Sequence, residues 1–166
     1  MAKDKAYDIQ QKNKRKDNLK YLYFSRYLMT RYIVTIFLFV NIFWLTFSLP
    51  YKHWLGIAAA LCMTLCSAVA AIEQLTKMHN QELDVPLTRK YFWLQLGVNL
   101  ILLVLNLFPF GRVFFPFSSK KIVTQFISLI LIAGIILCLI CEWRIAKIRK
   151  NQDRYASVIE TFKKNH

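Results

Sequence analysis

Four amide side chains that could bind a polar ligand lie inside long apolar runs: Asn41, Gln95, Asn99 and Asn106. On a helix with about 100° per residue, the last three fall within about 40° of one another. Such a stripe can line a path for a substrate or an ion across a membrane. Alternatively, each amide bonds to a neighbouring helix, for about 0.6 kcal/mol, and only holds a bundle together. Because amides offer no titratable group to couple transport to a proton, this second interpretation is favoured.

The four cysteines also lie in apolar runs, and Cys138 and Cys141 have the spacing of a metal or redox pair. No histidine accompanies them in these runs, and cysteine packs in helix cores as a small apolar residue. We therefore expect no metal site and no disulfide.

Catalytic residues are scarce in the sequence. There is no Ser/His/Asp grouping, no HExxH motif and no phosphate-binding glycine loop, and the nine acidic residues lie outside the apolar runs. His79, Glu82 and Asp84 lie close together in one polar connection, where a weak metal or acid/base site is the alternative to a solvated loop. We expect no catalytic residues, no cofactor and no enzyme. An enzyme acting on lipid headgroups is the third-ranked function and rests only on this connection.

Four apolar runs without Lys, Arg, Asp or Glu must position these residues: 32–49, 54–72, 91–110 and 122–141. The apolar fraction of 56% and the mean hydropathy of +0.33 are high, since globular chains are about 45–50% apolar. As helices, the runs would measure roughly 27 to 30 Å, the thickness of a hydrocarbon core of about 30 Å. The sequence predicts an all-α membrane protein with four transmembrane helices, arranged as two helical hairpins.

Basic residues are concentrated on one side of this arrangement. Residues 1–31, 73–90 and 142–166 carry nine, three and seven Lys or Arg, whereas the connections on the other side carry four. The positive-inside rule then places both termini in the cytoplasm. The net charge of +14 is mostly a topology signal, and no nucleic-acid motif accompanies it. We expect a multi-pass protein of the plasma (cytoplasmic) membrane; the lysine-rich composition fits an AT-rich, bacterial genome.

The chain divides into three regions: a basic N-terminal segment 1–31, the transmembrane domain 32–141 and a basic C-terminal helix 142–166. Both terminal segments are expected to be cytoplasmic and interfacial, with a helix beginning near Asp17 and an apolar face near the C-terminus. That face consists of Ile148, Tyr155, Ile159 and Phe162. Anionic lipid headgroups should bind the basic run of Lys12, Lys14, Arg15 and Lys16.

Small residues follow one side of the second run, at the spacing that lets helix backbones approach closely. They are Gly56, Ala60, Thr64, Ser67 and Ala71, and Gly134, Cys138 and Cys141 form a shorter version in the fourth run. Such faces must meet another helix, in the same chain or in a partner. The leading hypothesis is therefore a non-enzymatic subunit of a membrane complex, with an accessory, regulatory or immunity-type role. Its partner would be another membrane protein or a second copy; the runner-up is a small, dimeric transporter or channel with an amide-lined path.

An offset of 58 residues maps Thr30-Arg31 onto Thr88-Arg89, and Val40-Asn41 onto Val98-Asn99. The chain thus resembles two copies of one hairpin, related by an axis along the membrane normal. Chance matching in a biased composition is the alternative. Each hairpin would begin at an Arg and end at a Glu, which predicts Arg31–Glu73 and Arg89–Glu142 ion pairs, or the same residues exchanged. Asn41 and Asn99 should face the bundle interior at matching depth, because an amide facing lipid is unsatisfied.

Overall fold

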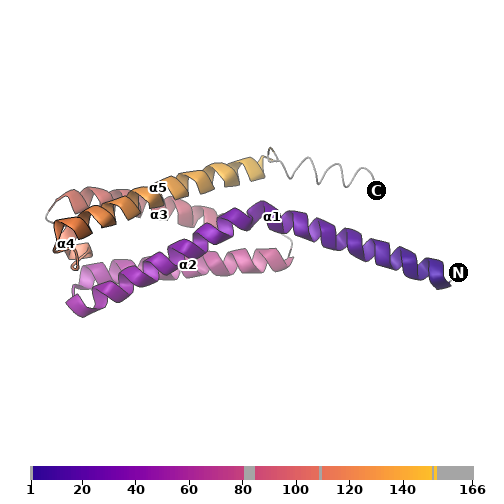
Figure 1. The fold of residues 1–166 in the computed structure, drawn as a ribbon, viewed down its shortest axis with the longest axis horizontal. Coiled ribbons are helices and arrows are strands. Elements are labelled where there is room, and N and C mark those ends of the chain that lie inside the picture. Colours follow the sequence, from indigo (N-terminus) through magenta and orange to yellow (C-terminus); the bar gives the residue numbers. More distant parts are fainter. Residues whose placement is uncertain (1, 81–84, 109, 151, 153–166) are drawn as a thin grey trace.

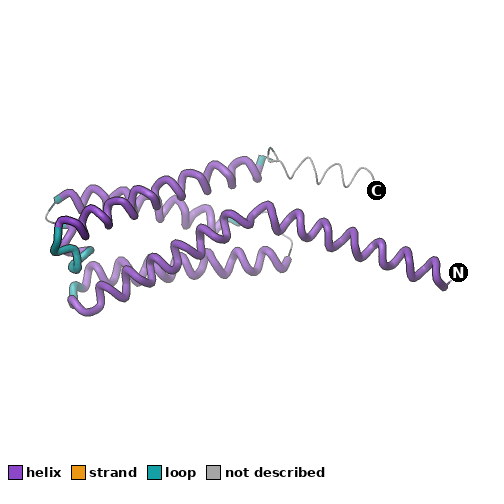
Figure 2. Tube along the Cα trace, viewed as in Figure 1, coloured by secondary structure: helices purple, strands orange, loops and turns teal. Residues whose placement is uncertain are grey.

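The computed structural model describes residues 2–80, 85–108, 110–150 and 152, and all regular structure among them is helical. The elements, drawn in Figures 1 and 2, are α1 (Ala2–Ser48), the 3-10 turn η1 (Leu49–Tyr51), α2 (Trp54–Asn80), α3 (Pro86–Leu107), α4 (Gly111–Phe114) and α5 (Lys121–Arg149). Four segments are long and apolar enough to cross a membrane: Tyr27–Tyr51, Trp54–Lys77, Pro86–Leu107 and Lys121–Arg149. The predicted all-helical protein with four potential membrane spans is confirmed.

The ends of these helices follow from local chemistry. Pro50 and the left-handed backbone of Lys52, with φ of 55°, make the tight turn between α1 and α2. Pro86 occupies the first turn of α3, where its missing N–H costs nothing. No glycine or proline precedes Pro50, so nothing interrupts α1, which begins at Ala2 rather than near Asp17 as expected.

The helices pack as two pairs, with the most extensive contacts between α1 and α2 and between α3 and α5. The pairs meet along two lines of contact, which we call the α2–α3 seam and the α1–α5 seam. Helices α2 and α3 touch more extensively than α1 and α5 do. We call the end of the bundle near Thr30 and Thr88 the basal end; α4 closes the opposite end (Figure 1).

Most apolar side chains point away from the bundle. Between 22% and 33% of the residues in the most apolar part of each candidate span are buried. Large side chains such as Phe43, Leu65, Ile101 and Leu129 are more than half exposed. Soluble monomers rarely expose apolar patches of this extent, so this surface suits contact with lipid or with other membrane helices.

The buried positions repeat at the offset seen in the sequence. Every buried residue between positions 27 and 48 has a buried counterpart 58 residues later. The pairs are Tyr27/Val85, Thr30/Thr88, Ile33/Tyr91, Val34/Phe92, Phe37/Gln95, Asn41/Asn99, Trp44/Leu102 and Ser48/Asn106. Helices α2 and α5 match at an offset of 71 for six of the seven buried residues of α2, and the exception is Glu73, whose counterpart Arg144 is half-buried. The six pairs are Gly56/Ile127, Ala60/Leu131, Met63/Gly134, Ser67/Cys138, Ala70/Cys141 and Gln74/Ile145. The two pairs therefore bury equivalent faces.

Candidate functional site

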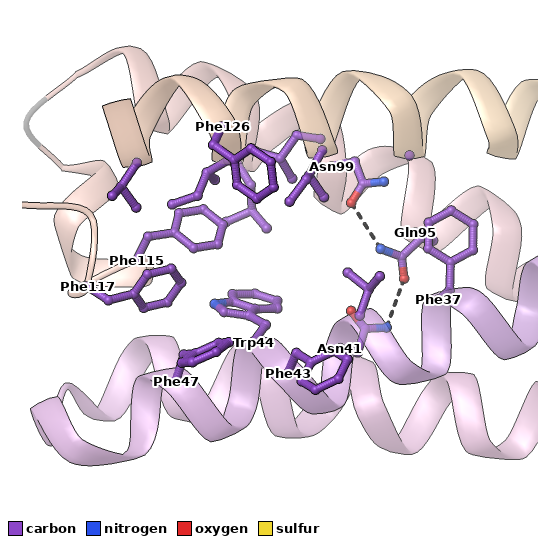
Figure 3. Close-up of a pocket in the computed structure, with 17 residues that line it drawn as sticks. Phe37, Asn41, Phe43, Trp44, Phe47, Gln95, Asn99, Phe115, Phe117 and Phe126 are labelled. Atoms are coloured by element: carbon purple, nitrogen blue, oxygen red, sulfur yellow. Dashed lines mark hydrogen bonds between the residues drawn. The ribbon is translucent and has the colours of Figure 1, made fainter. Parts of the chain in front are cut away.

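Three of the four amides form a hydrogen-bonded chain across the middle of the bundle (Figure 3). Asn41 Nδ2 donates to Gln95 Oε1 at 3.4 Å, and Gln95 Nε2 donates to Asn99 Oδ1 at 3.0 Å. Tyr91 Oη donates to Gln95 Oε1 at 2.9 Å, and Asn41 Nδ2 also reaches the carbonyl of Met63 on α2 at 3.4 Å. All three amides are buried, so this chain of hydrogen-bonded amides links α1, α2 and α3 inside the bundle.

Helix α5 accommodates this chain at Gly134. A Cβ atom at Gly134 would lie 2.6 Å from Asn99 Nδ2 and 3.5 Å from Phe37 Cε1. Glycine thus leaves the space that the Asn99 amide occupies. The amide chain therefore reaches from α1 to the surface of α5.

The fourth amide, Asn106, lies apart from this chain. Its Nδ2 donates to the carbonyl of Thr124 at 3.1 Å and to Ser128 Oγ at 2.8 Å, both on α5. This side chain joins α3 to α5 near the α4 end. The expected stripe of Gln95, Asn99 and Asn106 is buried, but its hydrogen bonds divide it into a central chain and a separate α3–α5 link.

A cavity of about 430 Å³ lies beside the amide chain, between α1, α3 and α5. We call it the lateral cavity. Asn41, Gln95 and Asn99 form its polar wall, and the rest of its lining is apolar. Seven aromatic side chains contribute (Figure 3): Phe37, Phe43, Trp44, Phe47, Phe115, Phe117 and Phe126.

The lateral cavity opens sideways, through the α1–α5 seam. Phe43 of α1 is 58% exposed and Phe126 of α5 is 62% exposed, although both line the cavity. Val40 and Ile130 extend the same two edges. The opening therefore lies on the outer, apolar surface of the bundle.

An aromatic segment closes the cavity toward α4. Trp44 Nε1 donates to the carbonyl of Phe114 at 3.0 Å, and its ring lies 5.4 Å from that of Phe115. Phe47 and Phe117 form a second ring contact at 5.8 Å. The chain after α4 thus folds back into the bundle and packs against α1.

The chain matches no protein-family model, no curated protein and no solved structure.

The carboxylate of Glu73 caps the beginning of α3. It accepts hydrogen bonds from the backbone N–H groups of Leu87, at 3.1 Å, and Thr88, at 2.5 Å, and from Thr88 Oγ1 at 2.6 Å. Gln74 Nε2 donates to the same hydroxyl at 3.2 Å. The first N–H groups of a helix lack intrahelical partners and carry positive potential, so a buried carboxylate is well matched to them. Glu73 and Gln74 thereby close the basal end of the α2–α3 seam.

The predicted ion-pair residues have different environments. Arg89 Nε lies 3.6 Å from Glu142 Oε2, as expected for one of the pairs. The carboxylate of Glu73, in contrast, accepts hydrogen bonds from Leu87 and Thr88 at the start of α3. At the offset of 71, the residue of α5 that corresponds to Glu73 of α2 is Arg144. Its Nη1 lies 3.5 Å from Met29 Sδ of α1. A cap is unnecessary there, because α1 continues through Met29 and leaves no unpaired helix start.

The predicted small-residue face of α2 packs inside the chain. Gly56, Ala60 and Ser67 are buried, and Thr64 and Ala71 are half-buried. On α5, Gly134, Cys138 and Cys141 are likewise buried within the bundle. These faces join helices of one chain, and the outer surface is formed by larger apolar side chains.

The remaining candidates lie at the edges of the described structure. Lys14 is exposed on α1, whereas the side chains of Lys12, Arg15, Lys16 and His79 fall outside the described residues. Glu82, Asp84, Tyr155, Ile159 and Phe162 also lie outside them. Among the side chains that are described, no three His, Cys, Asp or Glu gather as metal ligands, and the four cysteines are free thiols.

Proposed function

We propose that the chain forms two helical hairpins of a parallel repeat, with both termini in the cytoplasm. The matching burial of α1 with α3, and of α2 with α5, supports the repeat, because the 58-residue offset was set by sequence identities alone. The excess of Lys and Arg at the basal end supports the orientation. Cysteines introduced at Lys14 and Lys120, labelled with a membrane-impermeant maleimide, test it. Labelling of Lys14→Cys from outside intact cells would show that the orientation is the opposite of the proposed one.

We further propose a non-enzymatic role in the membrane, as an accessory, regulatory or immunity-type subunit that binds another membrane protein through the lateral cavity. The main support for this proposal is that the aromatic cavity opens sideways between α1 and α5, which contact each other only weakly. A partner helix lying along the α1–α5 seam would bury Phe43, Phe126 and Ile130 and insert its side chains into the cavity. This is the helix-in-groove mode of recognition.

The polar wall supports a protein partner over passive filling by lipid. An acyl chain gains nothing from Asn41, Gln95 and Asn99, whereas a polar side chain of a partner helix can hydrogen-bond to an amide inside the membrane. The small-residue faces are occupied within the chain, so a partner would engage the aromatic opening instead.

Photo-crosslinking tests this proposal. A benzophenone amino acid at Phe43 or Phe126 should crosslink to one discrete protein in the native membrane, and the same group at Leu65 on α2 should not. The replacement Val123→Trp, which fills the lateral cavity, should abolish the crosslink from Phe43 without reducing the amount of folded protein.

Three outcomes would overturn the partner model. Crosslinks to lipid alone would make the cavity a lipid-chain site, and crosslinks to a second copy would make it a homo-oligomer interface. Equal protein crosslinking from Leu65 would show that the cavity has no special part in the interaction.

A small transporter is the second candidate, because the three central amides line the lateral cavity. Reconstituted protein should then pass a solute, and Gln95→Leu or Asn99→Leu should abolish the flux while the protein still accumulates. Unchanged flux in both variants would remove the amides from the path.

A further inference from the structure

A second cavity, of about 530 Å³, lies at the basal end of the bundle and has a different lining. We call it the basal pocket. Three cationic residues line it: Arg89 and Lys90 of α3 and Arg149 of α5. The other walls are apolar or aromatic and include Tyr27, Trp93 and Ile145.

The charges in this pocket are incompletely balanced. Arg89 contacts Glu142 at 3.6 Å, but its side chain is 41% exposed while that of Glu142 is 14% exposed. Within the described part of the chain, no carboxylate lies within ion-pair distance of Lys90 or Arg149. Among the described residues, three cations face one carboxylate, and this excess of positive charge attracts an anion.

The aromatic wall indicates where the anion belongs. Trp93 follows Arg89 by one helical turn and therefore lies one turn further into the apolar span of α3. Its side chain is 58% exposed. Indole rings with this surrounding favour the membrane–water interface, where lipid headgroups lie. A phosphodiester beside Arg89, Lys90 and Arg149 would place its glycerol backbone near Trp93 and its acyl chains along the apolar surface of the bundle.

We infer that the basal pocket is a specific binding site for the headgroup of an anionic phospholipid. Cations in the pocket bind the phosphate, and the aromatic and apolar walls hold the start of the chains. Basic pockets between membrane helices on the cytoplasmic side of a bilayer, where the proposed orientation puts the basal end, recognise acidic lipids in the same way. The inference requires that the helices cross a bilayer, but it is independent of the partner proposed for the lateral cavity.

Lipid titration of the detergent-solubilised, full-length protein tests the site. Native mass spectrometry would follow binding of phosphatidylglycerol, with phosphatidylcholine as the neutral reference lipid. The variant Lys90→Gln/Arg149→Gln should weaken phosphatidylglycerol binding about tenfold to thirtyfold and leave phosphatidylcholine binding unchanged. Lys90 and Arg149 are both exposed, so the double variant should retain the fold. Circular dichroism checks this.

The matched control is Lys147→Gln/Lys150→Gln. These two exposed cations lie on or just after α5 at the same end of the bundle but outside the pocket, and Lys147 Nζ lies 3.8 Å from the Trp143 ring centroid. A less than twofold change in this variant supports a specific site. Equal weakening in the two double variants would overturn it in favour of diffuse attraction.

Free glycerol phosphate separates a lipid site from a site for soluble phosphate. A large excess of it should leave phosphatidylglycerol bound, because the soluble anion lacks chains to pack against Trp93 and Ile145. Displacement at concentrations equal to those of the lipid would overturn the lipid assignment and indicate a soluble phosphate ligand.

Discussion

The two seams of the bundle join equivalent helix faces and yet differ in how they are closed. Along the α2–α3 seam, Glu73 and Gln74 hydrogen-bond to the start of α3. Along the α1–α5 seam, Ile145 corresponds to Gln74 and Arg144 to Glu73. The two helices contact each other less extensively there and flank the lateral cavity. A repeated burial pattern can therefore specify two pairs of similar packing, while a few polar residues decide which seam is sealed.

Chain connectivity accounts for the difference. Helix α3 begins at Pro86, so its first N–H groups need acceptors, and Glu73 supplies them. Helix α1 passes the same level without a break and has no such need. The open seam is thus the one where the chain gives no unpaired backbone groups to bind.

Removing the cap from the closed seam should have the largest effect on stability. Glu73→Leu leaves two backbone donors and the Thr88 hydroxyl without their acceptor, at a cost of about 2–4 kcal/mol in the free energy of unfolding. Unfolding in mixed micelles of mild detergent and dodecyl sulfate would measure it. Glu142→Leu, which removes the carboxylate that contacts Arg89, should cost less than about 1 kcal/mol.

Charge reversal sharpens the same point. Glu73→Arg should not be rescued by Arg31→Glu, because an arginine cannot accept the hydrogen bonds of Leu87 and Thr88. Rescue by the double reversal would establish an Arg31–Glu73 pair as the main function of Glu73.

The second-largest effect should come from Gly134, where α5 meets the amide chain. Gly134→Ala drives a methyl group into Asn99 and should cost about 1–3 kcal/mol. Gly97→Ala is the control, because a Cβ there meets nothing within 4 Å. It should be neutral or stabilise α3 by up to about 1 kcal/mol. Equal thermal stability of the two variants would contradict the observed packing of Asn99 against α5.

Breaking the amide chain at its centre should have a smaller effect. Gln95→Leu removes the shared partner of Asn41, Tyr91 and Asn99, and should cost about 1–2 kcal/mol. Gln125→Leu, at an exposed position on α5, provides the control and should change the unfolding free energy by less than about 0.5 kcal/mol.

The smallest of these effects concerns the aromatic closure of the open seam. Trp44→Phe removes the hydrogen bond to the Phe114 carbonyl and should cost about 0.5–1.5 kcal/mol. The measurement is again unfolding in mixed micelles. A loss as large as that of Glu73→Leu would mean that the two seams contribute equally, and that the distinction between them is wrong.

Much of the fold was predictable because membrane spans have a strong and simple signal. The four uncharged runs predicted the helix ends on the α4 side to within three residues, whereas every helix extends five or more residues further at the basal side. The 58-residue offset selected the buried side of α1 and α3. The N-terminal extent of α1 was missed because its polar first turns have no apolar face, although they contain neither glycine nor proline.

The candidate site was only partly predictable. The buried amides stood out as polar residues in apolar runs, but their partners depend on how the two helix pairs pack against each other. The lateral cavity also depends on this packing, which no local pattern encodes. The role of Glu73 had a usable signal: an acid at the end of one span and Pro86 at the start of the next.

Helix α1 has a mechanical consequence. It changes direction where it leaves the other helices, yet it remains one uninterrupted helix from Ala2 to Ser48 (Figure 1). We call the part of α1 outside the bundle the outer arm and the part inside it the inner arm. Because the two arms are joined at an angle in one continuous helix, a sideways swing of the outer arm turns the inner arm about its own axis. Asn41 and Trp44 lie on that inner arm, about 35 Å and about 39 Å along the helix from Asn18. A molecule that pulls the outer arm sideways would thus rotate one wall of the lateral cavity without touching it.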